Sequence, residues 1–244
     1  SHLSFAEVLR AVGLMIFLSA GFPVGKAHIA ALSSMRAKGQ AISDAKPAIP
    51  NSAISIPVDD CAADTLSFWA SRFSNWDRRC PVWLDFGPTS SWQIIGACDA
   101  STDWGCGGWF FDGSELFLFS HEWTPDERLS AFSKLRESMG VLELLGALYW
   151  FKYFASRCSH LRTELWLDNR SASSALSRWW STTATMLNVL KEIRVLCVDN
   201  FIILHPCHVL GTPFNVIADL LSHHHIEEAI CRAEQQFGIV AKII

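Results

Sequence analysis

The sequence lacks any apolar run long enough to cross a membrane as a helix. Its apolar stretch Ala11–Pro23 is shorter than the roughly 18–20 residues that a crossing needs. The same stretch lacks the basic start and the cleavage site of a signal peptide. We therefore expect no membrane partner and an intracellular protein, cytoplasmic or nuclear. The first residue is Ser rather than Met, which we interpret as the start of a piece cut from a longer polypeptide.

Cysteine pairs with the spacing of a zinc site are also missing. None of the eight cysteines belongs to a Cys-x-x-Cys pair, so their spacing predicts no zinc site. The cysteines are scattered among apolar residues, which is typical of buried free thiols in a reducing compartment. A disulfide framework is not expected in a chain this long and this apolar.

Basic residues are not in excess. The chain has 20 Lys and Arg against 24 Asp and Glu, a formal net charge of −4. Nucleic-acid-binding proteins usually carry a basic surplus, so the bulk charge argues against that function. The objection is limited, because carboxylates that bind divalent cations add negative charge by design. A longer parent protein could also supply basic surface.

Apolar residues are abundant. Half of the 244 residues are hydrophobic and 18% are charged, so the chain can bury a core and is not intrinsically disordered. The length fits one or two domains. Eleven Trp and sixteen Phe offer core, interface or base-stacking surface, and we favour the core.

The beginning of the chain has a helical pattern. Ser4–Arg36 carries apolar residues at helical spacing, interrupted at Gly21–Pro23, which predicts two helices joined by a turn. Ala37–Pro57 is rich in Ala, Ser and Pro and indicates a linker. Val58–Asn75 predicts a further helix, with Asp59 at its positive end.

A change of pattern near Pro81 divides the chain into two expected domains. Residues 1–80 predict a helical segment with a linker, and residues 81–244 follow the order βββαβαβα. Asp103–Gly108 is rich in glycine and predicts a tight turn. The order predicts an α/β fold with a mixed five-stranded sheet, three antiparallel strands followed by two parallel ones, flanked by helices. The expected strands are 92–100, 108–112, 116–122, 161–167 and 201–207, and the expected helices are 138–156, 169–180, 184–194, 216–222 and 226–236.

Four acidic residues stand in apolar surroundings. Asp99 and Asp168 each end an apolar strand, whereas Glu143 and Asp219 lie within apolar helical segments. A lone buried carboxylate is costly and tends to take up a proton. Several become tolerable when divalent cations neutralise them, and oxygen ligands favour Mg²⁺, with Mn²⁺ as the alternative. Two such ions about 3.5–4 Å apart can clamp the attacking and leaving oxygens of a phosphodiester.

Each acid taken alone has a simpler interpretation as a helix cap or a salt-bridge partner. Asp168, for example, could cap the helix that begins after Asn169. The specific feature is the order of all four: strand–Asp, helix–Glu, strand–Asp-Asn and helix–Asp. The carboxyl ends of strands are also where α/β sheets place their sites, so the joint pattern favours a shared metal site.

Four segments carry these acids: Cys98–Trp109, Val141–Leu148, Leu167–Ala172 and His208–Ser222. Together they resemble the ribonuclease H family, most closely the domain of retrotransposon reverse transcriptases of the DIRS (tyrosine-recombinase) type. The resemblance runs from Ile94 to His225. It implies a ribonuclease H-like fold and endonucleolytic hydrolysis of the RNA strand of RNA–DNA hybrids with two Mg²⁺ ions.

The resemblance also implies roles for single residues. Asp99 would bridge both ions, Glu143 and Asp168 would hold one and contact the attacking water or the substrate, and Asp219 would complete the other. His208 matches the family's mobile-loop histidine, which helps to position water or release product. The interval from His208 to Asp219 is one residue longer than the family pattern, and a loop histidine is otherwise a neutral surface residue.

Three polar residues lie beside the acids: Ser101, Asn169 and Arg170. The resemblance implies that such positions contact the nucleic-acid backbone or the RNA 2′-hydroxyl. Ordinary turn and cap chemistry is the alternative. The run His223–His225 could bind a metal ion, although an exposed histidine run is usually incidental.

The residues before Pro81 resemble, more weakly, the thumb and connection segment between a polymerase and its nuclease. The pieces that carry this resemblance are Leu9–Leu32 and Asp64–Trp69. No polymerase Tyr-x-Asp-Asp motif is present, so we expect no polymerisation by this chain. The implied partners are an RNA–DNA hybrid and the polymerase portion of a parent polyprotein.

Two other functions stay open. An inactive or domesticated copy could keep the fold and bind nucleic acid or a protein partner without cutting. A different ribonuclease H-like enzyme, such as an integrase, transposase or exonuclease, is the third interpretation. The presence of all four acids favours activity, and Asn169 and the segment Asn215–Asp219 favour the hybrid nuclease.

Overall fold

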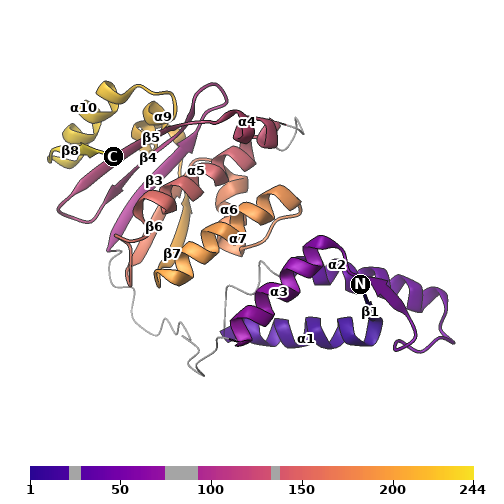
Figure 1. Cartoon of the computed structure of the whole chain (residues 1–244). Coiled ribbons are helices and arrows are strands. Elements are labelled where there is room, and N and C mark those ends of the chain that lie inside the picture. Colours follow the sequence, from indigo (N-terminus) through magenta and orange to yellow (C-terminus); the bar gives the residue numbers. More distant parts are fainter. Residues whose placement is uncertain (22–28, 75–92, 133–137) are drawn as a thin grey trace. The chain divides into compact units, whose positions relative to one another are not determined.

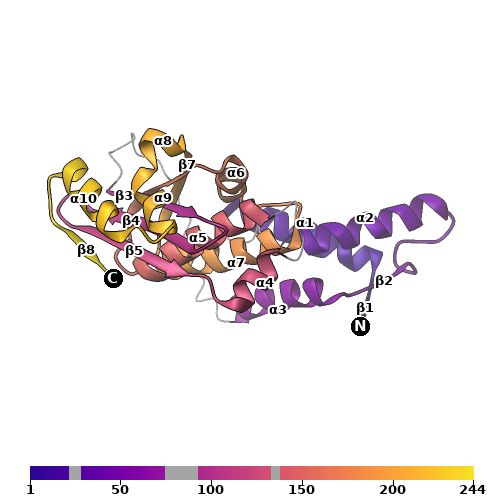
Figure 2. The ribbon, with the colours of Figure 1, turned by 90° about the horizontal axis from the view of Figure 1, so that it is seen from above.

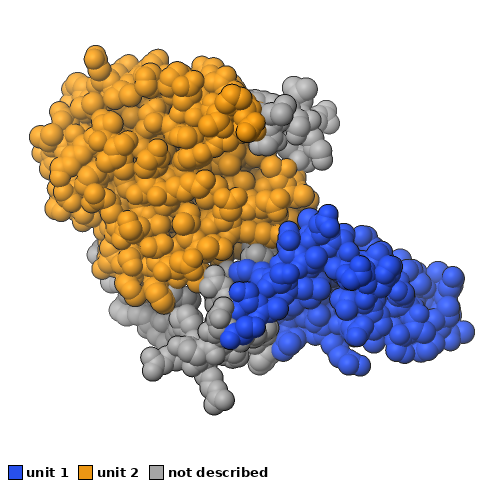
Figure 3. Space-filling view, viewed as in Figure 1, with its two compact units in different colours: residues 1–87 blue, residues 88–244 orange. Residues whose placement is uncertain are grey.

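The chain forms two compact units, Ser1–Gly87 and Pro88–Ile244 (Figure 3). The boundary expected between residues 80 and 81 lies outside the described residues, as do Phe22 and Pro23 of the first expected turn. The computed structural model describes residues 1–21, 29–74, 93–132 and 138–244.

The first unit is mainly helical and has its own core. Its elements are β1 (His2–Ser4), α1 (Phe5–Gly21), α2 (Ala30–Ala45), β2 (Ser55–Pro57) and α3 (Asp60–Ser74). β1 and β2 pair antiparallel, with Leu3 opposite Ile56. Asp59 caps α3 as expected, since its Oδ1 accepts a hydrogen bond of 2.9 Å from the backbone N–H of Ala62. The buried side chains include Phe5, Val8, Leu32, Met35, Ile56 and Trp69.

Part of the expected linker is helical. The expectation of a linker over Ala37–Pro57 is wrong at both ends, because residues 37–45 complete α2 and residues 55–57 form β2. Ala and Gln are good helix formers, and Gly39 lets α2 lie directly against α1. A Cβ at Gly39 would fall 2.2 Å from Cδ2 of Phe5, so close packing of the two helices extends α2 into the Ala-rich segment.

The second unit contains a mixed sheet. Its strands are β3 (Ile94–Ala100), β4 (Gly105–Phe111), β5 (Leu116–Glu122), β6 (Arg162–Leu167), β7 (Ile203–His208) and β8 (Ala241–Ile243). Their order is β7-β6-β3-β4-β5-β8. β3, β4 and β5 are antiparallel neighbours, and β6 and β7 add in parallel on the β3 side. The expected fold class is confirmed, with one correction: β8 pairs in parallel with β5 and makes a sixth strand.

Helices cover both faces of this sheet (Figures 1 and 2): α4 (Pro125–Phe132), α5 (Ser138–Phe154), α6 (Arg170–Arg178), α7 (Ala184–Asp199), α8 (Gly211–Phe214), α9 (Val216–Ser222) and α10 (Ile226–Phe237). On one face α5 packs on β3, β4 and α7, around Phe110, Phe151 and Leu165. On the other face α9 packs on β3, β4 and β5, and α10 packs on α9, around Trp109 and Leu221.

The glycines expected to form a tight turn lie mainly in β4. The turn covers residues 102–104, and β4 already begins at Gly105. A Cβ at Gly107 would fall 2.3 Å from Cβ of Leu221, and one at Gly105 would fall 1.8 Å from the carbonyl oxygen of His121. The glycines therefore allow α9 and β5 to approach the β4 backbone closely, which corrects the expected turn at Asp103–Gly108.

Two simpler expectations can be compared with the described residues. None of the helices in the described part of the chain is long and apolar enough to span a membrane. The seven described cysteines are free thiols. Cys98, Cys106, Cys158 and Cys197 are buried as expected, whereas Cys61 and Cys231 are exposed and Cys207 is half-buried.

Candidate metal-dependent active site

Three carboxylates meet where β3 and β6 end. Asp99 is the penultimate residue of β3, Asp168 directly follows β6, and Glu143 lies in α5. β3 and β6 are parallel neighbours, with Ala97 opposite Trp166, so their carboxyl ends lie at the same edge of the sheet. One oxygen of each carboxylate lies within 4.8 Å of those of the other two. We call Asp99, Glu143 and Asp168 the acidic trio.

Asp99 is the most closely held member. Its side chain is buried, at 5% exposure, and its Oδ2 accepts a hydrogen bond of 2.7 Å from the hydroxyl of Ser222. Burial, together with the charges of Asp168 and Asp219, raises the pKa of Asp99 to about 7, although the Ser222 hydrogen bond acts to lower it. A cation bound here would relieve both the desolvation and the repulsion.

Glu143 is buried and lacks a hydrogen bond to one of its carboxylate oxygens. It is 3% exposed, and its Oε2 is buried with no hydrogen-bond partner in the structure. Burial raises the pKa of Glu143 well above its ordinary value, followed by the charges of Asp99 and Asp168. A buried oxygen without a donor is expensive, and a hard cation is the kind of partner that would satisfy it.

Asp168 is the half-buried member of the trio. Burial raises its pKa, and the charge of Asp219 adds to that effect. Gly211 closes over it, because a Cβ at that position would fall 3.0 Å from Oδ2 of Asp168. The His208 ring also lies beside it: Nε2 is 3.0 Å from the Asp168 carbonyl oxygen, and His208 itself is exposed.

Asp219 stands apart from the trio. It lies on α9 as the sequence indicates, but its side chain is 59% exposed, and it is not among the acids that converge within 4.8 Å. Its charge still acts on Asp99 and Asp168, whose pKa values it raises. The structure thus brings three of the four expected acids together and places the fourth at the exposed rim.

Hydrogen bonds between α9 and the sheet hold this arrangement. The Asn215 side chain donates to the carbonyl oxygen of Cys98 at 3.1 Å, and the Ser120 hydroxyl donates to that of Leu221 at 2.7 Å. The sequence did not single out Asn215 or Ser222 as site residues. The available signal for Ser222 was its spacing, since it follows Asp219 by three residues on α9.

The expected substrate-binding residues differ in what they already contact. Ser101 is buried, and its hydroxyl accepts 3.2 Å hydrogen bonds from the backbone N–H groups of Trp104 and Gly105 and donates to the carbonyl oxygen of Ser222 at 2.7 Å. Asn169 caps α6, since its Oδ1 accepts 3.0 Å hydrogen bonds from two backbone N–H groups of the first turn. Arg170 is exposed at the start of α6. Ser101 and Asn169 therefore have the turn and cap contacts of the simpler alternative, and Arg170 faces solvent.

The histidine run is held by neighbours in the β3–β4 turn. Nδ1 of His223 lies 3.4 Å from Oδ2 of Asp103, and the His224 ring stacks on Trp104 with centroids 4.2 Å apart. Two groups of potential metal ligands occur in the described parts of the chain, and neither includes a residue of this run.

The donor chemistry of the acidic trio fits Mg²⁺. All three ligands are carboxylate oxygens, which hard cations prefer, one buried oxygen has no other partner, and all three pKa values are raised. The trio can hold divalent cations at an edge of the sheet that Asp219, His208 and Arg170 flank.

Comparison with known proteins gives similar solved structures but no family. No family model matches the sequence, and no curated protein matches it. A solved structure, the N-terminal RNase H domain of a Mycobacterium tuberculosis protein fused to maltose-binding protein, is similar to this chain at 15% identity with a TM-score of 0.37. The match covers 59% of this chain and 99% of the other, and at these values it does not identify the chain as a relative.

Proposed function

We propose that the second unit is a metal-dependent ribonuclease H that hydrolyses the RNA strand of RNA–DNA hybrids. The observation that carries the proposal is the acidic trio: three carboxylates, 44 and 25 positions apart in the sequence and two of them buried, converge at the carboxyl edge of the sheet. The segments around these residues resemble the ribonuclease H family, and this resemblance is the reason for proposing an RNA–DNA hybrid as the substrate.

The position of each residue in the site suggests its role in holding the metal ions. Asp99 would hold both Mg²⁺ ions, Glu143 and Asp168 would hold one of them, and Asp219 would complete the other from the exposed rim. When bound, the ions supply a nucleophilic water and stabilise the leaving oxygen of the phosphodiester. Ser222 would keep the Asp99 carboxylate oriented through its 2.7 Å hydrogen bond, so that the ligand does not have to reorganise during turnover.

The exposed residues around the trio suit contacts with the hybrid. Arg170 offers charge-assisted hydrogen bonds to a phosphate, and the Asn169 amide nitrogen remains for the RNA strand because its oxygen caps α6. His208 lies beside Asp168 at the mouth of the site, where it would assist water positioning or product release.

The wider context follows from the same resemblance. The first unit would be the thumb and connection segment of a DIRS-type retroelement reverse transcriptase, and the partner would be the polymerase portion of that polyprotein. Its helical make-up, α1, α2 and α3 around a common core, is compatible with such a connecting role.

The decisive test is a cleavage assay with the full chain. A labelled 20-base-pair hybrid, the matching DNA duplex and the single-stranded RNA are incubated with Mg²⁺, with Mn²⁺ or with a chelator. We expect the RNA strand of the hybrid to be cut only with a divalent cation, while the DNA duplex stays intact. Equal cutting of both duplexes would support a different ribonuclease H-like enzyme, and tight hybrid binding without cutting would support an inactive copy.

A further inference from the structure

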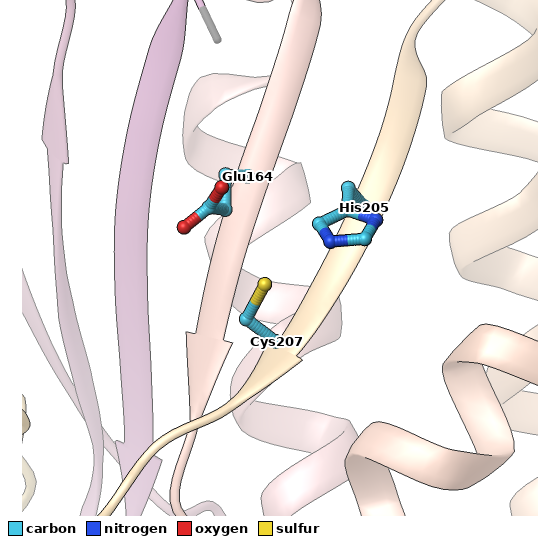
Figure 4. A group of neighbouring side chains, drawn as sticks. All are labelled: Glu164, His205 and Cys207. Carbon is cyan, nitrogen blue, oxygen red and sulfur yellow. The ribbon is translucent and has the colours of Figure 1, made fainter. Parts of the chain in front are cut away.

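A second group of potential metal ligands lies on β6 and β7, away from the acidic trio. Glu164 of β6 and His205 of β7 are direct neighbours in the parallel register, and Cys207 follows His205 by two residues. Side chains two residues apart on a strand share a face, so all three project from the same side of the sheet. Figure 4 shows them on that side of the two strands.

The ligand atoms of this group converge. A carboxylate oxygen of Glu164, a ring nitrogen of His205 and the sulfur of Cys207 all lie within 4.8 Å of one another. His205 is exposed, and Glu164 and Cys207 are half-buried, so a cation has a path from solvent. We call these three residues the mixed cluster.

A neighbouring side chain holds one ligand of the mixed cluster in place. Oε1 of Glu164 accepts a hydrogen bond of 2.6 Å from the indole N–H of Trp166, which orients the carboxylate as outer-shell partners do in metal sites. On this face α9 packs on β3, β4 and β5, and α10 packs on α9, β5 and β8, so the end of the sheet at β7 stays accessible.

We propose that the mixed cluster binds a zinc ion. Thiolate, imidazole and carboxylate are the three ligand types that Zn²⁺ accepts, and three protein ligands leave the fourth tetrahedral position for water. Mg²⁺ is disfavoured, because it requires oxygen ligands. On binding, the Cys207 thiol would release its proton, so that the thiolate and the Glu164 carboxylate balance the charge of the ion.

A zinc ion here would fasten β7 to β6. β7 is the strand at one end of the sheet, and such edge strands have one unpaired side. Cys207 directly precedes His208, so the ion would also fix the start of the loop that runs beside Asp168. Glu164 precedes Asp168 by four residues, about 13 Å along an extended strand, so the two metal sites are separate and this proposal does not rest on the nuclease function.

The test uses the full chain in excess Mg²⁺, so that the acidic trio is not available to the probe metal. Zn²⁺ affinity is measured by competition with a chromophoric chelator, and Co²⁺ serves as the spectroscopic probe because a cobalt–thiolate bond gives an intense near-ultraviolet charge-transfer band. We expect one equivalent of Co²⁺ to give this band and Zn²⁺ to abolish it by displacement.

Variants assign the band to the cluster. Cys207→Ser should remove the band and weaken Zn²⁺ binding at least ~10-fold, since even outer-shell partners cost about that much. The matched control is Cys231→Ser, which removes an exposed thiol on α10 and should change neither. Glu164→Gln should weaken Zn²⁺ binding while keeping the thiolate band, and it decides the matter if Cys207→Ser does not fold.

Two results would overturn the proposal. One is a native protein whose cobalt spectrum has no thiolate band. The other is a Cys207→Ser protein, or failing that a Glu164→Gln protein, that binds Zn²⁺ as tightly as the native chain. Asp99→Asn should leave the thiolate band intact, which separates this site from the proposed catalytic centre.

Discussion

The acidic trio and the mixed cluster are two solutions to metal binding on one sheet. Both use β6, but the trio has three carboxylates, two of them almost fully buried, whereas the mixed cluster has one carboxylate and an exposed histidine. The trio therefore concentrates negative charge where water cannot screen it. The mixed cluster holds little charge, because burial and the nearby carboxylate raise the pKa of Cys207 to about 11 and keep the thiol protonated.

The difference shows which of the two clusters lowers the stability of the cation-free protein. Desolvation and mutual repulsion raise the pKa of each member of the trio, so the cation-free protein holds these groups at a cost to its stability. The mixed cluster carries no comparable cost. We expect the trio to need cations for its chemistry and the mixed cluster to need one only to fasten an edge.

The largest effect should come from Asp99→Asn. This change keeps the shape of the side chain but removes the charge that would hold both ions, so hybrid cleavage should fall at least ~100-fold, as for the loss of a preorganised charge-stabilising group. Cleavage is measured under single-turnover conditions with saturating Mg²⁺. Zinc binding by the mixed cluster should not change.

A variant of the mixed cluster tests whether the loss of cleavage is specific to the acidic trio. Cys207→Ser should abolish the cobalt–thiolate band and leave hybrid cleavage within a few-fold of the native rate. Asp126→Asn removes an exposed carboxylate of α4 and controls for the loss of any acid. Full turnover by Asp99→Asn would remove the trio from the mechanism and break the comparison.

The next effect is on stability and follows from the raised pKa of Asp99. The folded-state value of about 7 lies above the ordinary value of 3.8, so the folded protein binds more protons than the unfolded chain between these values. In a chelator, the free energy of unfolding should therefore fall as pH rises from about 4 to about 7, by on the order of a few kcal/mol. Urea denaturation of the full chain at several pH values measures it.

Two changes should flatten that profile. Mg²⁺ should restore stability at neutral pH, because it binds the charged trio of the folded state. Asp99→Asn should make the cation-free protein as stable as the native chain or more stable at pH 8, because it removes a buried charge. An unfolding free energy that rises with pH over this window would show that the trio is not under electrostatic strain.

The contrast between the clusters also shows what a sequence can reveal. Asp99 and Asp168 were predictable, because each ends an apolar strand where a carboxylate has no ordinary reason to be. The exposure of Asp219 was not, because it depends on how α9 packs. Cysteine spacing could not predict the mixed cluster, because its ligands meet only through the strand register that places Glu164 opposite His205.

The fold shows the same division. Apolar runs and helical periodicity predicted the order of the first five strands of the sheet. The glycines of β4 were assigned to a turn, because their role in close packing is visible only with α9 in place. The helix α4 was missed despite a local signal: Thr124 and Glu127 form a capping box, with the Glu127 carboxylate accepting from the Thr124 backbone N–H at 2.8 Å. Long-range packing, rather than local pattern, accounts for most of what was not predicted.

The smallest expected effect concerns the hydrogen bond from Ser222 to Asp99. Ser222→Ala removes the hydroxyl that lies 2.7 Å from Asp99 Oδ2. Because this hydrogen bond lowers the pKa of Asp99, its loss should raise that pKa by about one pH unit, the equivalent of ~1.4 kcal/mol. The measurement is an NMR titration of the Asp99 carboxyl carbon in cation-free protein.

Ser120→Ala is the matched control for this change. The Ser120 hydroxyl also donates a 2.7 Å hydrogen bond to α9, but to the carbonyl oxygen of Leu221 rather than to a carboxylate. Its loss should cost about 1 kcal/mol of unfolding free energy and leave the Asp99 titration where it was. Equal shifts in both variants would mean that Ser222 only anchors α9, and that burial and repulsion alone set the charge state of the trio.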